Sequence, residues 1–232
     1  MFLTRPIRDV RPATPRARTV TIDLAGTPFP YLAGQAVFIG AHGAEQRKPY
    51  SIAAAPEESI REDGLELLVG VDAEGNPSGN LPLEPGSLVD IDGPIGRFTF
   101  PIEPAERRFL FIAGGTGISP LRAMMHHALN VPHDAIGLLF SARTASEFAY
   151  EQEFRSLAAA RRIELELRVT CEVAGEWSGV RGRIGRDDLA PLVHERATLC
   201  FICGPPALVQ EIPQILDDLG VPRKCIKTEE WT

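Results

Sequence analysis

A glycine-rich stretch, AGGTGISPLRAMM, has the composition of a loop that binds phosphate. Glycines let the backbone approach a ligand closely, and the unpaired N–H groups at the start of a following helix attract anions. The stretch is not a P-loop, because no Gly-Lys-Ser or Gly-Lys-Thr follows it. Gly115 and Gly117 fit the first two glycines of the dinucleotide fingerprint, but Pro120 stands where the third should be. Ser119 is predicted as the N-cap of the helix. The alternative to phosphate binding is that the glycine stretch is simply a tight turn from strand to helix.

The second strand of the same region ends in FSART, which supplies a hydroxyl at Ser141 and a guanidinium at Arg143. NAD-binding domains usually place an acid here to hold the ribose hydroxyls. A hydroxyl and a guanidinium suit a 2′-phosphate instead, so the pattern favours NADPH over NADH. The alternative is that Arg143 simply faces solvent. Three further arginines, in GVRGRIGR, could join the same phosphate: Arg181, Arg183 and Arg186.

The spacing of the four cysteines argues against a metal centre. Cys200 and Cys203 form a CxxC pair, a spacing found in redox pairs and in half of a zinc site. A zinc site needs a second close pair, whereas Cys171 and Cys225 are isolated in the sequence. Cys203 begins CGPP after an apolar strand, where its thiol could pack against a flat ring or simply fill the core. No metal ion and no iron–sulfur cluster is expected.

The first half of the chain holds a second set of candidate ligands, in RKPYSI. Alternation along a strand puts Lys48 and Tyr50 on one face. A cation and a phenol on one face can serve a phosphate and an aromatic ring together, and Ser51 adds a hydroxyl. Further along, Ser78 and Gly79 in GNPSGNL are typical of a short turn that suits phosphate. Ordinary strand and turn residues are the alternative for each motif taken singly.

Two kinds of pattern divide the chain. Up to about residue 103, short β-branched runs such as RTVTIDLAG and QAVFIGAHG alternate with Gly and Pro, which predicts a small antiparallel barrel or sandwich. Beyond this point, strand-like and helical runs alternate, which predicts right-handed βαβ units and a parallel sheet. We therefore expect an N-terminal antiparallel barrel over residues 1–103 and a parallel-sheet α/β domain over residues 104–232.

Composition narrows the classes of function. The chain has 232 residues, a hydrophobic fraction of 44% and a net charge of −7. Such an acidic balance argues against general nucleic-acid binding, which needs a basic face. No apolar run is long enough for a membrane-spanning helix. The arginine-rich N-terminus could be a transit peptide, but its prolines and the strand-like run after it favour a cytoplasmic protein with free thiols.

The order of the motifs is more specific than any motif alone. Along the chain come KPYS, GNPSGNL, GPIGRF, GGTGISP, CGPP and EEW. This ordered set resembles the ferredoxin–NADP reductase superfamily over essentially the whole chain, and it is most similar to the bacterial flavin reductase modules of oxygenase and electron-transfer systems. The resemblance implies a flavin-binding barrel followed by an α/β domain that binds the nicotinamide nucleotide.

The resemblance also implies roles for the matched residues. Tyr50 would pack on the flavin ring, Ser51 would hydrogen-bond near its reactive nitrogen, and Lys48 would meet a phosphate where the family usually has Arg. Glu229 would neighbour Ser51 and Cys203, with the Cys203 thiol beside the nicotinamide. The catalytic set is Ser51, Cys203 and Glu229. The cofactor-binding set is Lys48, Pro49, Tyr50, Ser51, Ser78, Gly79, Gly114, Gly115, Thr116, Gly117, Ser141, Arg143, Gly204, Pro205 and Trp231.

Trp231 has two interpretations: it covers the flavin, or it is a tail aromatic packed into a domain interface. The activity implied is that of an NAD(P)H-dependent flavoprotein reductase carrying FAD, with FMN as the alternative. Electrons would pass to a separate acceptor, such as a ferredoxin, an iron–sulfur subunit or an oxygenase. Two other functions stay open: a free-standing NAD(P)H reductase of flavins or quinones, and an electron-transfer subunit that is inactive outside its complex.

Overall fold

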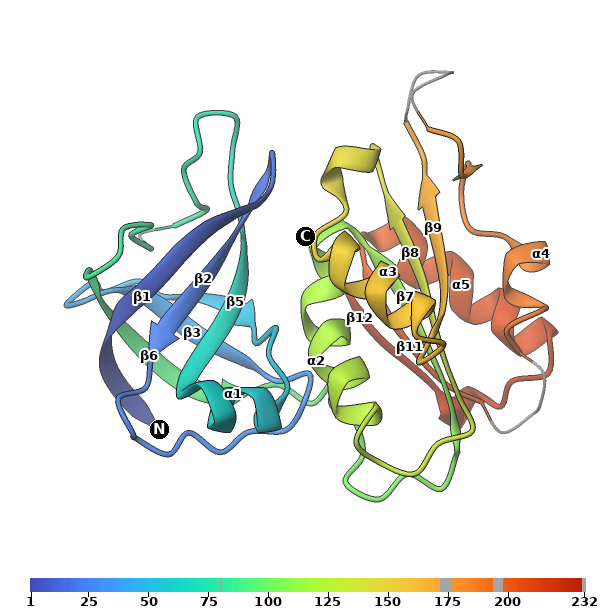
Figure 1. Cartoon of the computed structure of the whole chain (residues 1–232), viewed down its shortest axis with the longest axis horizontal. Coiled ribbons are helices and arrows are strands. Elements are labelled where there is room, and N and C mark those ends of the chain that lie inside the picture. Colours follow the sequence, from blue (N-terminus) through green and yellow to red (C-terminus); the bar gives the residue numbers. More distant parts are fainter. Residues whose placement is uncertain (80, 172–176, 194–197, 231–232) are drawn as a thin grey trace. The chain divides into compact units, whose positions relative to one another are not determined.

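The first half of the chain forms an antiparallel barrel in the computed structural model, which describes residues 1–79, 81–171, 177–193 and 198–230 (Figure 1). Its strands pair only in antiparallel fashion, in the order β4-β3-β6-β1-β2-β5. A bridge between Ile52 and Leu67 joins the two outer strands of this order and closes the barrel. The strands are β1 (Phe2–Thr14), β2 (Ala17–Asp23), β3 (Ala36–Ala41), β4 (Lys48–Ser51), β5 (Gly64–Gly70) and β6 (Leu88–Ile95).

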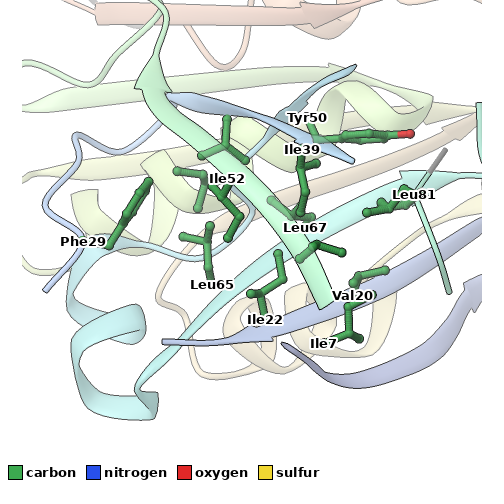
Figure 2. Packing of buried hydrophobic residues seen from close by; sticks show 14 of the residues in the cluster. Ile7, Val20, Ile22, Phe29, Ile39, Tyr50, Ile52, Leu65, Leu67 and Leu81 are labelled. Carbon is green, nitrogen blue, oxygen red and sulfur yellow. The ribbon is translucent and has the colours of Figure 1, made fainter. Parts of the chain in front are cut away.

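Alternating apolar side chains fill the inside of the barrel. Val89 and Ile91 on β6 are fully buried, whereas Leu88 on the opposite face is 48% exposed. Leu65 and Leu67 on β5 point into the same core, which Figure 2 shows from close by. A side-chain period of two is what a strand with one buried face requires, so the sequence pattern and the barrel agree.

The second half of the chain forms a sheet of six parallel strands in the order β10-β9-β8-β7-β11-β12. Strands β7 and β11 are buried along nearly their whole length, as their continuous apolar runs require. The strands are β7 (Arg108–Gly114), β8 (Ala135–Ala142), β9 (Glu164–Val169), β10 (Val180–Arg181), β11 (Thr198–Gly204) and β12 (Ile226–Glu230). The predicted fold class, an antiparallel barrel followed by a parallel-sheet α/β domain, is confirmed.

Helices connect the parallel strands. They are α2 (Ile118–Ala128), α3 (Glu151–Ala159), α4 (Arg186–Leu189) and α5 (Pro206–Asp218), and the barrel half adds α1 (Pro56–Glu62). Figure 1 shows α3 and α5 on opposite faces of the parallel sheet. A right-handed crossover gives this result, because the chain leaves β7 in one direction for β8 to β10 and reaches β11 on its other side. Among the described residues, no helix is both long and apolar enough to cross a membrane.

The start of α2 differs from the sequence prediction. The helix begins at Ile118, directly after a 3-10 turn over Gly115–Gly117, so Ser119 lies inside the first turn and is not its N-cap. Ser119 is only 3% exposed. The physical reason is that Ile118, directly before Ser119, already has right-handed helical dihedral angles (φ −63°, ψ −26°), so Ser119 lies past the extended position that a side-chain cap needs.

The chain divides into two compact units. The first comprises Met1–Phe100 together with Arg122–His127 from the middle of α2, and the second comprises Pro101–Leu121 and Ala128–Thr232. The segment of α2 in the first unit was not foreseen from the sequence, which suggested a single point of division near residue 103.

A buried ion pair joins that segment to the rest of the first unit. The Glu58 carboxylate accepts a hydrogen bond from the backbone N–H of Ala55 (2.8 Å) at the start of α1. The Arg122 guanidinium lies 3.1 Å from the same carboxylate and donates to the carbonyl of Ala53 (2.8 Å). Burial alone would raise the pKa of Glu58, but the His126 hydrogen bond and the Arg122 charge lower it to about 2. Glu58 is therefore ionised at neutral pH.

Candidate functional site

The strand order of the parallel sheet reverses between β7 and β11. From β7 the chain moves outward through β8, β9 and β10, and it then returns to β11 on the other side. Ligands of open α/β sheets bind beyond the carboxyl ends of the strands at such a switch point. Two predicted motifs meet there: the glycine loop follows β7, and CGPP spans the end of β11 and the turn into α5.

Glycines allow the two loops to touch backbone to backbone. A Cβ atom on Gly117 would lie 2.4 Å from the carbonyl oxygen of Cys203 and 2.7 Å from the nitrogen of Gly204. A Cβ atom on Gly114 would lie 2.7 Å from Cδ of Pro205. These are closer than a Cβ atom tolerates, so glycine is required at both positions. The predicted site residues of the two motifs are thus brought together.

The tip of the glycine loop is open, in contrast to the tightly packed positions Gly114 and Gly117. Gly115 and Thr116 are exposed, and no atom lies within 4 Å of a Cβ built on Gly115. Gly115 also has a φ of +55°, a left-handed conformation that favours glycine. A cradle of exposed backbone next to the N-terminus of an 11-residue helix fits a pyrophosphate well.

The residues predicted beside the ribose lie along the same edge of the sheet. Ser141 on β8 is in register with Gly114 on β7, and it is half-buried. Arg143 follows β8 and is exposed. Its carbonyl accepts a hydrogen bond from the N–H of Cys171 (2.8 Å), which fixes the backbone at this point. The exposed Arg143 guanidinium therefore extends from a backbone that a hydrogen bond fixes in place.

Cys203 and Glu229 lie side by side on β11 and β12. The two residues are in register, with the Cys203 side chain buried and the Glu229 side chain half-buried. The family resemblance implies this proximity, and the sheet register provides it. All four cysteines are free, and Cys171 is exposed while the other three are buried. Among the described residues, no group of three or more His, Cys, Asp and Glu side chains is arranged to hold a metal ion.

In the first unit, the KPYS motif makes up the whole of β4, and its tyrosine holds the distant loop. Tyr50 is 8% exposed, and its hydroxyl donates to the carbonyl of Ser78 (2.9 Å). Burial raises the pKa of Tyr50, so the phenol stays protonated and available as a donor. Ser51, the last residue of the motif, is 4% exposed and pairs with Ala36 on β3. The Tyr50 hydroxyl thus joins the two predicted flavin motifs, KPYS and GNPSGNL.

Lys48 and Gly79 complete that junction. A Cβ atom on Gly79 would lie 3.0 Å from Cγ of Lys48, and Gly79 has a φ of +105°. Gly79 therefore makes room for the lysine stem, while Lys48, Pro49 and Ser78 are exposed. Arg47 takes no part, because it lies 3.6 Å from the buried Asp90 carboxylate. An exposed ammonium beside a Ser-Gly turn fits a phosphate as a point charge.

Trp231 and Arg168 differ from the residues above in how sequence and structure relate. Trp231 lies outside the residues that the structure describes. Arg168 on β9 was missed by sequence reasoning, although it is in register with Ser141 and its side chain is 8% exposed. An arginine inside the run ELELRVT was the available signal, because buried charges are rare without a specific partner.

Comparison with known proteins gives consistent matches. Residues 111–214 match the family model of the oxidoreductase NAD-binding domain. Ferredoxin–NADP reductase B of Sorangium cellulosum (strain So ce56) is 34% identical over 237 residues, covering 96% of this chain and 94% of the relative. The crystal structure of Amycolatopsis cytochrome P450 reductase GcoB is similar with a TM-score of 0.84 and 25% identity, covering 99% of this chain and 69% of that one. The flavohem-like FAD/NAD binding domain of nitric oxide dioxygenase from Vibrio cholerae O1 biovar El Tor has the same fold, with a TM-score of 0.81, 21% identity and 98% coverage of both chains.

Proposed function

The chain is an oxidoreductase that belongs to the ferredoxin–NADP reductase superfamily, and on that premise we propose that it moves hydride from NAD(P)H onto a bound flavin and passes electrons to a separate acceptor protein. The observation that carries the proposal is the presence of one phosphate cradle in each unit. The Gly115 tip serves the nicotinamide nucleotide, and Lys48 beside the Ser78–Gly79 turn serves the flavin.

The flavin belongs to residues 1–103 in this proposal. When bound, a flavin supplies a ring that accepts hydride and releases electrons one or two at a time. Lys48, Ser78 and Gly79 hold its phosphate, and the larger FAD is proposed over FMN. Tyr50 places an aromatic ring against it, and the Ser51 hydroxyl donates toward its reactive nitrogen. The hydrogen bond from Tyr50 to Ser78 supports this role, because it fixes the phosphate turn relative to the strand.

The nicotinamide nucleotide belongs to residues 104–232. The backbone of Gly114, Gly115, Thr116 and Gly117 binds the pyrophosphate, and Cys203, Gly204, Pro205 and Glu229 surround the nicotinamide. Because Cys203 and Glu229 are in register on adjacent strands, a thiol and a carboxylate are offered to one ring. Ser141 and Arg143 bind a 2′-phosphate, so NADPH is the proposed coenzyme.

The proposed acceptor is a ferredoxin, an iron–sulfur subunit or an oxygenase. The relatives support an electron-transfer role, since one is named ferredoxin–NADP reductase B and another cytochrome P450 reductase. A free-standing reductase of flavins or quinones would instead turn over rapidly with a small acceptor and no partner protein.

The test is an anaerobic visible spectrum of the purified protein, recorded after NADPH or NADH is added to separate samples. Protein reloaded with FAD and protein reloaded with FMN are matched samples that separate the two flavins. We expect a yellow protein that bleaches within seconds and faster with NADPH. A protein that retains neither flavin after reloading would overturn the proposal. Retained flavin that neither nucleotide reduces would indicate a subunit that needs its complex.

A further inference from the structure

The segment that follows Ser51 is buried and irregular. Residues 52–55, termed the IAAA segment, lead from the end of β4 to the start of α1, and every one of them is buried. Ile52 packs inside the barrel (Figure 2), and the three alanines carry no polar side chain. Buried backbone groups need hydrogen-bond partners, so the polar groups of this segment depend on residues outside it.

Backbone partners hold the first part of the IAAA segment. The N–H of Ile52 donates to the carbonyl of Gln35 (2.9 Å), and the N–H of Ala53 donates to the carbonyl of Glu66 (2.8 Å). These bonds extend the pairing of the barrel past Ser51, which is the last residue of β4. The chain then leaves this pairing toward α1, and side chains supply the next hydrogen bonds.

Arg122 and Glu58 provide those hydrogen bonds. The Arg122 guanidinium on α2 donates to the carbonyl of Ala53 (2.8 Å), and the Glu58 carboxylate accepts from the N–H of Ala55 (2.8 Å). The two side chains, 11% and 13% exposed, lie 3.1 Å from each other. The guanidinium and the carboxylate thus form a clamp that closes over residues 53–55.

Arg122 contributes more to this clamp than a positive charge. Glu58 also has His126 as a partner at 3.1 Å, and Glu66 lies 3.9 Å from Arg122 as a second carboxylate. Charge balance is a weak reason for burying an arginine, because apolar residues often replace buried ion pairs without loss. The distinctive contribution of Arg122 is its hydrogen bond to the Ala53 carbonyl. The rigid fork of a guanidinium can bind that carbonyl and a carboxylate together.

The carbonyl that Arg122 holds lies two residues beyond Ser51. Consecutive Cα atoms are about 3.8 Å apart, so a shift of Ala53 reaches Ser51 through two peptide units. Strand β4 has only four residues, and Ser51 at its end pairs with Ala36. So short a strand has few ladder bonds to resist a shift. Reacting groups are sensitive to such shifts, because misplacement by about 1 Å can cost on the order of 100-fold in rate.

We propose that Arg122 is a positioning residue for flavin reduction: by holding the Ala53 carbonyl, it fixes the backbone that aims the Ser51 hydroxyl. This role rests on the proposed function, in which the Ser51 hydroxyl donates toward the flavin. Arg122 itself takes no part in the transfer, in which NAD(P)H gives up a hydride, that is two electrons and one proton, and the flavin accepts it. The buried arginine of α2 thus serves the reaction as well as the fold.

The experiment is anaerobic stopped-flow reduction of the full chain, reloaded with the flavin that it retains, by a saturating concentration of the nucleotide that reduces the wild type faster. Arg122→Lys keeps the positive charge beside Glu58, but its single ammonium lacks the fork that reaches the Ala53 carbonyl at the same time. We expect the rate of flavin bleaching to fall roughly tenfold, and the dissociation constant of the flavin to change by less than about twofold.

Arg8→Lys is the matched control. Arg8 also pairs with a carboxylate, that of Asp23 (2.7 Å), and also donates to a backbone carbonyl, that of Glu62 (2.7 Å). The carbonyl of Glu62 is at the C-terminal end of α1, away from the IAAA segment. Arg8→Lys should therefore bleach at the wild-type rate.

Ser51→Ala distinguishes positioning from a general loss of structure. This variant should bleach slowly by itself. Because Arg122 acts through the Ser51 hydroxyl, Arg122→Lys should change the rate by less than about twofold once that hydroxyl is absent. Loosened structure would instead slow both backgrounds by the same factor, and that result would overturn the role of Arg122.

Glu58→Gln is the second variant, used if Arg122→Lys does not fold. It keeps an acceptor for the N–H of Ala55 but weakens the hold on the Arg122 guanidinium. We expect a roughly threefold loss of bleaching rate, which should also disappear in the Ser51→Ala background. An equal loss with and without the Ser51 hydroxyl would again overturn the positioning role.

The remaining outcomes separate this role from the proposed function. A wild type that retains no flavin, or whose flavin neither nucleotide reduces, would overturn hydride transfer by this chain and the role of Arg122 with it. Unchanged bleaching in Ser51→Ala would remove the Ser51 hydroxyl from the reaction and overturn the role of Arg122, while leaving the reductase intact. Slow bleaching in Ser51→Ala together with wild-type bleaching in Arg122→Lys would overturn the role of Arg122 alone.

Discussion

The two candidate phosphate loops rest on different kinds of support. At Gly114 and Gly117, the backbone is fixed because side chains are absent, and a neighbouring loop fills the space that Cβ atoms would occupy. Around Ser78–Gly79, the backbone is fixed because a polar side chain is present, namely Tyr50 with its hydrogen bond to the Ser78 carbonyl. The second unit should therefore suffer most when atoms are added, and the first unit when a polar atom is removed.

The same difference extends along each unit. In the first unit, Arg122 and Glu58 hold the backbone at Ala53 and Ala55 through hydrogen bonds. In the second unit, Gly204 approaches Gly114 so closely that a Cβ atom would lie 3.0 Å from its Cα. Backbone packing of this kind allows almost no adjustment, whereas a side chain can shift to keep a bond. The glycine loop is thus the more rigid of the two loops, and it suits a ligand whose binding requires fixed backbone positions.

Gly117→Ala should have the largest effect. The added Cβ atom meets backbone atoms of Cys203 at 2.4 and 2.6 Å, which cannot move aside as the end of a side chain can. We expect the free energy of unfolding of the second unit to fall by about 3 kcal/mol or more, measured by urea unfolding. Gly220→Ala is the control, because Gly220 has a φ of +90° but open space around it. Equal losses in the two variants would show that steric contact is not what requires glycine.

Glu58→Gln should come next, and it tests the polar support of the first unit. The variant removes the carboxylate nearest to the buried Arg122 guanidinium and leaves Glu66, 3.9 Å away, as a remaining charge partner, so we expect a loss on the order of 2 kcal/mol at pH 7. The folded pKa of Glu58 is lowered from 4.5 to about 2, so its contribution is complete above pH 4.5 and is lost as the pH falls toward 2. The difference between wild type and variant should shrink accordingly.

Urea unfolding at pH 7 and at pH 3.5 measures that difference. Glu57→Gln is the matched control, because Glu57 is 43% exposed and lies beside His127 on the surface. A difference between wild type and Glu58→Gln that stays constant between the two pH values would contradict the role given to the Glu58 charge.

Gly115→Ala should separate stability from binding. The left-handed φ of +55° costs an alanine about 1 kcal/mol, and nothing clashes with the new methyl group. The methyl group would nevertheless occupy the space offered to a pyrophosphate, so the affinity for NADP⁺ should fall at least about tenfold. Calorimetric titration measures this, with Gly220→Ala again as the control. Unchanged affinity would mean that the loop tip does not bind the pyrophosphate.

Tyr50→Phe should have the smallest effect on stability, about 1 kcal/mol for one hydrogen bond. Because the Ser78 turn loses its tie to β4, flavin retention after dialysis should fall further than stability does. Tyr31→Phe is the matched control, since it removes a buried hydroxyl that donates to the carbonyl of Ala54 (2.9 Å) and lies 2.6 Å from the Ser59 hydroxyl on α1, with no contact to the Ser78 turn. If both variants retain flavin like the wild type, the tie between Tyr50 and Ser78 plays no part in binding.

The comparison also explains what the sequence could reveal. Glycine loops and runs of apolar residues are local patterns, so the sequence alone predicts GGTGISP, CGPP and the largely apolar strands β7 and β11. The proximity of Cys203 and Glu229 is implied by the family resemblance, and the two residues are in register on β11 and β12. The glycine loops and the buried strands depend on residue types, glycine and large apolar residues, that few others can replace at those positions.

Side-chain pairs between distant segments could not be placed in this way. Arg122 and Glu58 are 64 positions apart, and no local pattern links them. In the sequence, Arg168 is only an unexplained charge within a strand. The carbonyls to which it donates, those of Arg181 and Arg183, belong to a distant segment whose path the sequence does not reveal. Ser119 was assigned to a cap by its residue type, but the glycine turn before it continues directly into the helix.

The unequal exposure of the cysteines gives this protein an intrinsic labelling site. Cys171 is exposed while Cys200, Cys203 and Cys225 are buried, so a maleimide dye added to the native protein should attach at one position. That position is joined through its N–H to the carbonyl of Arg143. If the coenzyme binds beside Arg143 as proposed, a fluorophore on Cys171 would report its arrival in real time, without any substitution in the chain.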